Sequence, residues 1–480
     1  MQNIGYLEIS PTSLEFLKEQ AIDWALSHGL IIRSNSNFSS TVVHAPISLF
    51  PSPFPKKEFE LALELQPIFN LLFHKLSRDH ELIEKVVGEL INVDDFIQKL
   101  YNIYLTVRKE GITQQISLGL HRSDYILHMT PNSTDAHIQQ VEFNTISSSF
   151  SSLSTLTSEL HKYLLESTKY FDVSPALKID ALPTNEAMTN LPRGIAKAHQ
   201  LYGSKNTAVL MVVQPAERNA FDQRWIEYIL MNNYKIHLIR KTLFEIQRDG
   251  KLDKDTKTLI IDNKEICVVY FRSGYGPNDY PTEKEWDARL LIERSKAIKC
   301  PTVAYQLVGA KKIQQVLAIP GVLEKYISNP SDITKLRSCF TGLYPLDSSP
   351  EGEAAAKLAL EHPERFVMKP QREGGGNNIY TKDIPQLLRR ITPLERSSYI
   401  LMDLIQPPMM KNIVIREGKV IQGEMISELG IYGVFIGSNN GDEDVVINEI
   451  GGHLLRTKGK ETNEGGVATG YSVIDSPLLI

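Results

Sequence analysis

Cysteine is scarce in this chain of 480 residues, which has only Cys267, Cys300 and Cys339, far apart from one another. No CxxC pair is present, so neither a zinc site nor a dithiol redox centre is predicted. A sparse and odd-numbered set of cysteines is typical of a reduced, cytosolic protein in which thiols fill small spaces in the core. We therefore expect a cytoplasmic protein.

The sequence also lacks an apolar run of 18 residues, so no transmembrane helix is expected. The segment that begins at Met1 has neither a basic region nor an apolar core, which argues against a secretory signal. The formal net charge is −5, so there is no general basic field for nucleic acid. Membrane and nucleic-acid partners are therefore not expected.

The composition is that of a globular protein, with 42% hydrophobic and 23% charged residues. At roughly 100–200 residues per domain, the length suggests two to four domains. We place the boundaries at 1–205, 206–310 and 311–480. Alternating strand and helix patterns predict an α/β (α+β) fold.

Residues 1–115 are predicted to be mainly helical scaffold. Apolar residues recur near the helical period, and Gly29 stands where a helix would end: Leu14, Phe16, Leu17, Ala21, Trp24 and Ala25. Two more helices are expected at 59–76 and 82–107, and Pro67 should kink or split the first of these.

A strand at 138–144 alternates with period two. The pattern places Ile138, Gln140, Glu142 and Asn144 on one face, opposite the apolar side chains at 141 and 143. Glu142 and Asn144 then project together, and their oxygens suit a hard cation. A solvated polar strand face would give the same alternation.

Residues 206–310 are predicted to form a self-contained parallel α/β unit. The apolar run 207–213 is followed by a helix at 222–232, strands at 236–240 and 266–271, and a helix at 286–299. Ligands bind such sheets at the carboxyl ends of their strands, where two polar loops begin at Glu217 and Arg272. Arginine is suited to hold a carboxylate.

The stretch from Lys369 to Tyr380 contains three consecutive glycines, Gly374 to Gly376. Glycine lets backbone amides approach phosphate oxygens closely, Lys369 offers a positive charge, and Glu373 offers a hard oxygen to Mg²⁺. A flexible surface turn is the alternative. The stretch is neither a Walker A loop nor a dinucleotide-binding GxGxxG.

This stretch, KPQREGGGNNIY, resembles the glycine-rich loop of the eukaryotic glutathione synthetases, which belong to the ATP-grasp superfamily. The resemblance extends over nearly the whole chain: HRSDY at 121–125, VEFNTIS at 141–147, ERNAFDQ at 217–223, VVYFRSGY at 268–275, QLVGAKKIQQ at 306–315, SELGIYG at 427–433, and HLLRTK with EGGVATG at 453–470. It implies an ATP-grasp fold with an inserted substrate-binding domain and glycine-rich lid loops, the lid being at about 340–425.

The resemblance also implies an activity. The enzyme would ligate γ-L-glutamyl-L-cysteine with glycine through an acylphosphate, giving glutathione, ADP and phosphate in the second step of glutathione biosynthesis. ATP is the co-substrate, Mg²⁺ (two ions) the cofactor, and a homodimer the assembly. The cations and carboxylates of this chain suit such phosphoryl transfer, in which positioning and charge neutralisation dominate.

The family's functional residues carry over onto matching positions. Lys369 and Arg456 are the catalytic pair, and Glu142, Asn144 and Glu373 the Mg²⁺ ligands. The implied contacts to the dipeptide are Arg122, Ile146, Ser147, Ser148, Ser149, Glu217, Arg218, Asn219, Gln223, Arg272, Ser273, Gly274, Tyr275, Arg456, Val467 and Ala468. The implied contacts to ATP are Glu142, Lys311, Lys369, Glu373, Gly374, Gly375, Gly376, Asn377, Asn378, Tyr380, Met402, Asp403, Leu404, Ile405, Glu428, Lys458 and Glu464.

Two positions depart from the family pattern. Asp403 stands where glutamate is expected, and Thr469 where alanine is expected. The pair Val467-Ala468 differs from relatives that accept β-alanine, and so favours glycine. The alternatives are an ATP-grasp ligase that uses another amine, and a nucleotide-binding regulator without catalysis; the three intact cation ligands argue against the regulator.

Overall fold

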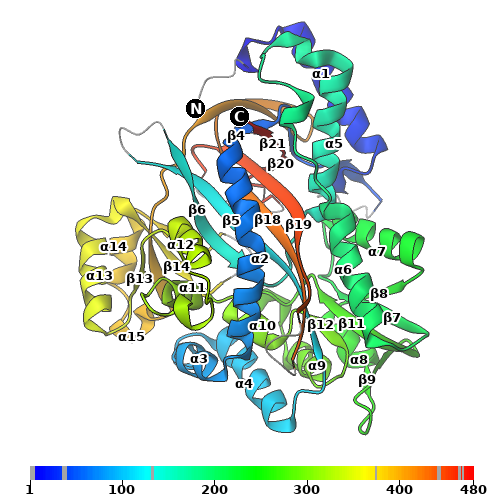
Figure 1. The fold of residues 1–480 in the computed structure, drawn as a ribbon, viewed down its shortest axis with the longest axis vertical. Helices are drawn as coiled ribbons and strands as arrows, with labels where there is room; N and C mark the ends of the chain where they lie inside the picture. The colour runs from blue at the N-terminus through cyan, green and yellow to red at the C-terminus, as the bar shows by residue number, and fades with distance from the viewer. Residues whose placement is uncertain are drawn as a thin grey trace.

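A seven-stranded sheet forms the centre of the molecule (Figure 1). In this computed structural model the described residues are 6–34, 40–130, 135–372, 376–439, 445–462, 466–467 and 470–480. The order of the strands is β17-β3-β20-β19-β18-β5-β6. Their bounds are β3 Ile47–Ser48, β5 Ile116–Met129, β6 Ala136–Asn144, β17 Met410–Arg416, β18 Lys419–Ser438, β19 Val445–Gly459 and β20 Val473–Asp475.

Helices cover both faces of this sheet, but one face only in part. The long helix α2 (Lys56–Arg78) lies across one face, in front of β18 and β19 in Figure 1. On the other face α6 (Ala187–Tyr202) packs near Leu120 and Val434, with α5 (Ser151–Thr168) beside it and α1 (Pro11–Ser27) on α5. Further along β5 the same face carries Arg122 and Asp124, and Arg122 lines a cavity there.

The second sheet contains the predicted parallel unit. Strand β7 (Thr207–Val212) pairs in parallel with β8 (His237–Lys241) and β11 (Lys264–Phe271), and β11 pairs in parallel with β12 (Ile298–Cys300). Strands β9 (Lys251–Leu252) and β10 (Leu259–Ile261) extend it antiparallel. Its helices are α7 (Ala220–Tyr234), α8 (Leu243–Asp249) and α9 (Glu283–Glu293). The expectation of a helix as far as residue 299 is wrong, because the chain turns into β12.

A third, four-stranded sheet has the order β13-β16-β14-β15, with bounds β13 Leu343–Pro345, β14 Phe366–Pro370, β15 Ile379–Tyr380 and β16 Tyr399–Asp403. Together with α13 (Pro350–Glu361), α14 (Asp383–Leu388) and α15 (Pro393–Arg396) it has its own small core, which includes Phe366, Met368 and Leu401. The remaining elements are β1 Ile31–Arg33, β2 Val42–His44, β4 Ser52–Phe54, β21 Pro477–Leu479, α3 His80–Leu82, α4 Asp95–Glu110, α10 Val303–Val308, α11 Lys311–Leu317 and α12 Pro330–Cys339.

Three expectations for the helical segment 1–115 are wrong in detail. Helix α2 runs unbroken through Pro67, because Leu65 and Phe69 on either side are buried in the same core. The predicted helix at 82–107 is interrupted, since Asp94 accepts a hydrogen bond from the Ile97 amide (3.0 Å) and begins α4 anew. Phe16, expected on the buried face of α1, is 46% exposed.

The alternation predicted for 138–144 is wrong at its centre. Tyr125 of β5 pairs with Gln140, but its neighbour Asp124 pairs with Glu142, so Val141 is an extra residue in β6. A bulge of this kind shifts the alternation by one position. Ile138 and Gln140 therefore belong to the buried face with Phe143, whereas Glu142 and Asn144 share the other face with Arg122 and Asp124.

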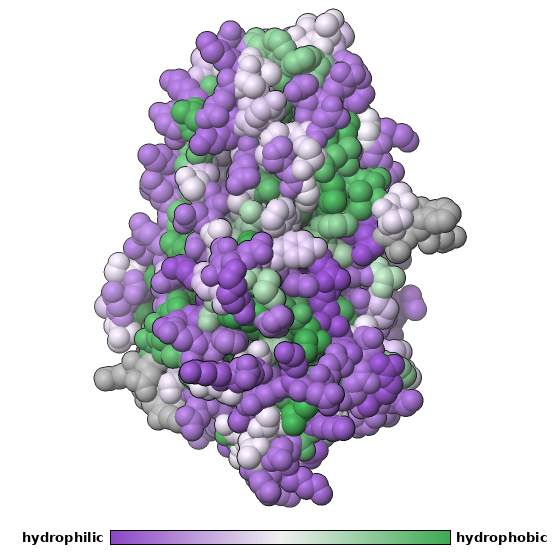
Figure 2. Space-filling view, turned by 90° about the vertical axis from the view of Figure 1, so that its right-hand side faces the viewer, coloured by the Kyte–Doolittle hydropathy of each residue, from purple (hydrophilic) through white to green (hydrophobic). Residues whose placement is uncertain are grey.

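Charged and polar side chains cover most of the surface on the side of α5, α6 and α7, with separate hydrophobic patches (Figure 2). None of the helices in the described part of the chain is long and apolar enough to cross a membrane. All three cysteines are buried and unpaired, which confirms their expected place in the core.

Candidate functional site

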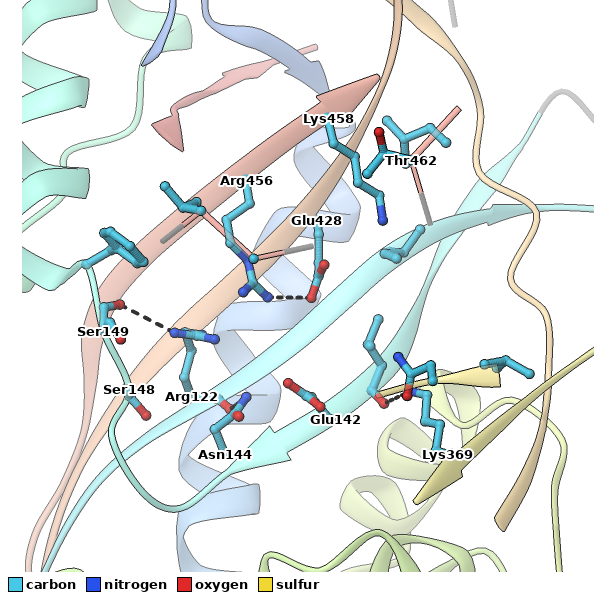
Figure 3. Close-up of a pocket in the computed structure, with 18 of the residues that line it drawn as sticks. Arg122, Glu142, Asn144, Ser148, Ser149, Lys369, Glu428, Arg456, Lys458 and Thr462 are labelled. Carbon is cyan, nitrogen blue, oxygen red and sulfur yellow. Dashed lines mark hydrogen bonds and ion pairs between the residues drawn. The ribbon is translucent and has the colours of Figure 1, made fainter. Parts of the chain in front are cut away.

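A cavity of about 430 Å³ lies where the three sheets meet. The central sheet contributes side chains from β5, β6, β18 and β19, and the four-stranded sheet contributes the ends of β14 and β16. Loops that follow β7 and β11, at the carboxyl ends of these parallel strands, complete the wall. In Figure 3 the labelled side chains lie on the face of the central sheet that is turned away from α2.

The floor of the cavity is a network of paired charges. Asp124 is fully buried and accepts hydrogen bonds from Arg122 Nε (2.6 Å) and Nη2 (2.8 Å), Asn144 Nδ2 (2.9 Å) and Arg456 Nη2 (3.0 Å). Arg456 also pairs with Glu428 Oε1 at 2.5 Å (Figure 3). Four of these five contacts, all except that from Asn144, fix the guanidinium groups of Arg122 and Arg456. A buried charge is tolerated only when it is paired in this way.

A second group of charges surrounds Glu142. Lys311 Nζ lies 3.0 Å from Glu142 Oε2, and Lys369 Nζ donates to the carbonyl of Val141 (2.9 Å) at the bulge. Burial alone would raise the pKa of Glu142, but the charges of Lys311 and Lys369 outweigh it and hold the pKa well below its ordinary value. Glu142 is therefore an ionised carboxylate at neutral pH, facing the cavity between two cations.

The wall formed by the loops after β7 and β11 is organised by Asp222, another fully buried carboxylate. Asp222 accepts hydrogen bonds from the amides of Phe150 (2.8 Å) and Ser152 (2.9 Å) at the start of α5, and from Arg272 Nη1 (3.1 Å). It thus ties the loop 147–149 to the arginine of the neighbouring sheet. Arg272 Nε and Ser148 Oγ are buried and have no hydrogen-bond partner among the described residues, and both residues line the cavity.

Between the central and the four-stranded sheets the cavity is mainly apolar. Ile126 and Ile426 face Val367 and the segment 402–405 across a slot that could hold a flat ring. Lys458, Lys460 and Thr462 lie at the β19 side of this slot (Figure 3 labels two of them). Lysines beside an apolar slot suit a ligand with a flat base and an anionic tail.

Most residues implied by the sequence line this one cavity: Arg122, Glu142, Asn144, Ile146, Ser147, Ser148, Ser149, Glu217, Asn219, Arg272, Tyr275, Lys369, Asn378, Tyr380, Met402, Asp403, Leu404, Ile405, Glu428, Arg456, Lys458 and Val467. Glu373, Gly374, Gly375, Glu464 and Ala468, with the departing Thr469, lie outside the described residues.

Other implied residues stand behind the cavity wall. Lys311 contacts Glu142 from behind, and Gln223 donates to Glu217 Oε2 (3.0 Å). Arg218 Nε donates instead to the carbonyl of Arg33 (3.3 Å), outside the cavity. Ser273, Gly274, Gly376 and Asn377 are not among the lining residues either.

Sequence reasoning gave no role to several residues that the structure brings to the site. Asp124 and Asp222 were inside matched motifs, but an isolated aspartate in a motif carries no sign of its partners. Asp124 and Asp222 are buried behind the wall, and the unassigned residues that line the cavity are Ile126, Val141, Phe150, Gln214, Val367, Gln406, Pro407, Ile426, Lys460, Thr462 and Gly466. Of these, only the cation Lys460 offered a chemical signal.

The chain is similar over nearly its full length to eukaryotic glutathione synthetases. Residues 11–479 match the family described as eukaryotic glutathione synthase, ATP binding domain. The chain is 46% identical over 477 residues to glutathione synthetase of Dictyostelium discoideum, covering 97% of this chain and 99% of the relative. It is 43% identical over 485 residues to glutathione synthetase of Homo sapiens, covering 100% and 99%. It is 42% identical over 478 residues to the chloroplastic glutathione synthetase of Arabidopsis thaliana, covering 97% and 86%.

Among solved structures, a glutathione synthetase-like effector from Globodera pallida superposes with a TM-score of 0.80 at 23% identity, covering 100% of both chains. At this identity the likeness speaks for the fold alone, and it agrees with the expected α/β architecture. The sequence matches, in contrast, extend over nearly the full length at 42–46% identity. The chain belongs to the eukaryotic glutathione synthetase family.

Proposed function

We propose that the protein is a glutathione synthetase, an ATP-dependent ligase that joins γ-glutamylcysteine to glycine and releases ADP and phosphate. The observation that carries this proposal is one cavity with two kinds of wall. One wall is apolar with lysines and suits a nucleotide, and the other combines Arg272 with Glu217 and suits the charged end of an amino acid. Arg456 and Lys369 line the same cavity, and the reacting groups would lie beside them.

The two ends of the dipeptide differ in chemistry. The γ-glutamyl end carries an α-carboxylate, which Arg272 would bind, and an ammonium group, which Glu217 would bind. The opposite end carries the cysteinyl carboxylate, the nucleophile of the first step. Arg122 and Arg456, both held by Asp124, would hold that carboxylate in line with the terminal phosphate.

In the first step a carboxylate oxygen attacks the γ-phosphorus and ADP leaves, giving an acylphosphate. Lys369 would supply positive charge near the phosphates, while Lys311 pairs with Glu142, and charge neutralisation is the main catalytic contribution in phosphoryl transfer. In the second step the amine of glycine attacks the acyl carbon, a proton is lost from nitrogen and phosphate leaves. Arg456 would stabilise the negative charge that develops on the carbonyl oxygen.

Mg²⁺ is part of this proposal, and the donor set fits it. Asn144 donates its amide hydrogens to Asp124 Oδ2 and the Arg122 carbonyl, which leaves its Oδ1 as an acceptor next to the ionised Glu142. Among the described residues no group of three acidic, histidine or cysteine side chains could hold a metal ion, so Glu142 and Asn144 would share the ion with Glu373 and phosphate oxygens. When bound, the ion supplies charge neutralisation between phosphate oxygens.

We further propose a cytoplasmic homodimer in which residues 206–310 bind the dipeptide and the glycine-rich loops close over the reacting groups. Closure would exclude water from an acylphosphate that otherwise hydrolyses. Val467 lines the cavity on the β19 side, and with Ala468 it would limit the acceptor to glycine. Asp403 accepts a hydrogen bond from Tyr344 (3.2 Å), so its shorter side chain is held on its own sheet.

The test is ADP release from Mg-ATP and γ-glutamylcysteine, measured with glycine, with β-alanine, with serine and with no amine. Release that depends on glycine is the expected result. Release with β-alanine or serine instead would keep the ligase mechanism and change the product. Nucleotide binding without release in any mixture would contradict the proposal and favour a regulator.

A further inference from the structure

Asp279 makes an unusual number of contacts for a residue outside the cavity. It ends the short 3-10 helix Pro277–Asp279, and its Oδ2 accepts hydrogen bonds from three successive amides, those of Gly274 (2.9 Å), Tyr275 (3.1 Å) and Gly276 (3.3 Å). One carboxylate oxygen thus accepts hydrogen bonds from all three backbone amides of residues 274–276, in the turn that follows Arg272. Charge-assisted hydrogen bonds of this kind are among the stronger ones in proteins.

The other oxygen of Asp279 holds side chains. Its Oδ1 accepts hydrogen bonds from Ser273 Oγ (2.9 Å) and from Gln214 Nε2 (2.9 Å), and the same Gln214 nitrogen donates to Tyr275 Oη (2.9 Å). Gln214 follows β7 whereas Tyr275 follows β11, so Asp279 joins the ends of two neighbouring strands. We call these residues, Gln214, Ser273, Tyr275 and Asp279, the clasp.

Two members of the clasp line the cavity. Gln214 and Tyr275 both face it, on the wall that contains Glu217 and Arg272. With both contacts of Gln214 made through Nε2, none of the described residues donates to its Oε1, so this oxygen is available to a donor on the ligand. An α-ammonium group next to an arginine-bound carboxylate is such a donor.

The conformation of the turn at residues 274–276 is unfavourable by itself and needs a stabilising interaction. Gly274 has φ +97°, a conformation that side-chain-bearing residues rarely adopt, and a Cβ there would lie 2.9 Å from Tyr280 Oη. Three amides that converge on one point would repel one another without a negative charge to receive them. The carboxylate of Asp279 is that charge.

We propose that Asp279 is a positioning residue for the γ-glutamyl end of the dipeptide, which acts by holding Gln214, Tyr275 and the turn after Arg272 in their binding geometry. This inference rests on the proposed function, since it assumes that the dipeptide is the ligand of this wall. Asp279 sets the affinity for the dipeptide and leaves the nucleotide side, which belongs to other sheets, unaffected.

The test compares Asp279→Asn with wild type. Asparagine keeps the shape but replaces one acceptor oxygen with a donor, so either the three amides or the two side chains lose their acceptor. The expected result is a rise of at least tenfold in KM for γ-glutamylcysteine, with KM for ATP within twofold of wild type. Asp287→Asn, an exposed aspartate on α9 in the same unit, is the matched control and should leave both values unchanged.

A merely structural role would raise both KM values together or lower the midpoint of thermal unfolding with no selective effect, and either outcome would overturn the inference. Should Asp279→Asn not fold, Ser273→Ala carries the test, because it removes one donor to Asp279 at a residue that is not among those lining the cavity. In the double variant the two effects on dipeptide KM should be less than multiplicative, since both break the same connection.

Calorimetric titration of γ-glutamylcysteine separates this inference from the proposed function. If wild type binds the dipeptide but does not ligate it, the proposed function fails and the ratio of the two Kd values still decides the role of Asp279. A ratio of tenfold or more supports that role, and a ratio below twofold overturns it. If wild type does not bind the dipeptide at all, both proposals are wrong.

Discussion

Replacing Asp124 with asparagine should disable the enzyme more than any other conservative change in the floor of the cavity. Asp124 accepts four hydrogen bonds, three of them from the guanidinium groups of Arg122 and Arg456. Asparagine can receive only those directed at one oxygen, and its amide group repels the other donors. The bidentate pair with Arg122 is lost in either orientation of the amide.

The expected loss of stability depends on which charged groups keep a partner in the Asp124→Asn variant. Removing one partner of a buried ion pair costs about 3–5 kcal/mol, because the remaining charge is left without compensation. Glu428 still compensates Arg456, but Arg122 keeps no carboxylate partner among the described residues, so we expect a loss of about 3 kcal/mol in the free energy of unfolding. If half of this loss also appears in the transition state, kcat/KM falls by roughly tenfold, and by more than a hundredfold if all of it does.

Urea unfolding gives the first quantity, and the rate of glycine-dependent ADP release gives the second. Asp255→Asn, at an exposed turn of the second sheet, is the control and should change neither. A variant with the wild-type unfolding midpoint and kcat/KM within threefold of wild type would refute the reasoning. The four hydrogen bonds to Asp124 would then contribute neither to the free energy of unfolding nor to catalysis.

Three further predictions concern other titratable groups. Glu142→Gln should reduce kcat about hundredfold, since the ion pair with Lys311 and a preorganised negative charge are lost; an unchanged kcat in the ADP assay would contradict a catalytic role of Glu142. Burial lowers the pKa of His121 to about 3, so its protonation in the unfolded chain should cost about 2 kcal/mol of stability between pH 7 and pH 5, and His121→Phe should abolish this acid sensitivity in urea unfolding. Burial lowers the pKa of Lys299 to about 8, so the unfolded chain holds more protons above that pH; stability should rise by about 2 kcal/mol from pH 7.5 to pH 9.5, and Lys299→Met should not show this rise.

The local order of the fold was largely readable from the sequence. The continuous apolar run at 207–213 identified a strand covered on both faces, and the structure pairs it in parallel on both sides. The start of α4 was missed although Asp94 is a good N-cap, because the apolar period continued across it. Local patterns specify elements well, and their ends less well.

The bulge in β6 is a feature that the alternation of polar and apolar residues in the sequence cannot predict. Glu142 and Asn144 were correctly paired, but Gln140 was placed with them because alternation was extended through Val141. The bulge depends on how β6 pairs with β5, and a single strand carries no record of its register.

The hydrogen-bond network around Asp124 could not be predicted from the sequence, for a different reason. Arg456, one of its partners, lies 332 residues further along the chain. A buried aspartate and an exposed one look alike in a sequence, and only the assembly of the sheet, in which β18 pairs with both β5 and β19, determines which one it is.

The burial of the three cysteines has a consequence for an enzyme that handles thiols. Thiol–disulfide exchange requires a thiolate with access to its partner. Burial raises the pKa of Cys267 to about 11 and that of Cys300 to about 12, and it raises the pKa of Cys339 further still. All three sulfurs therefore remain protonated and enclosed, so the protein forms no mixed disulfides with its own substrate or product, and oxidation of the surrounding thiol pool leaves the folded chain chemically unchanged.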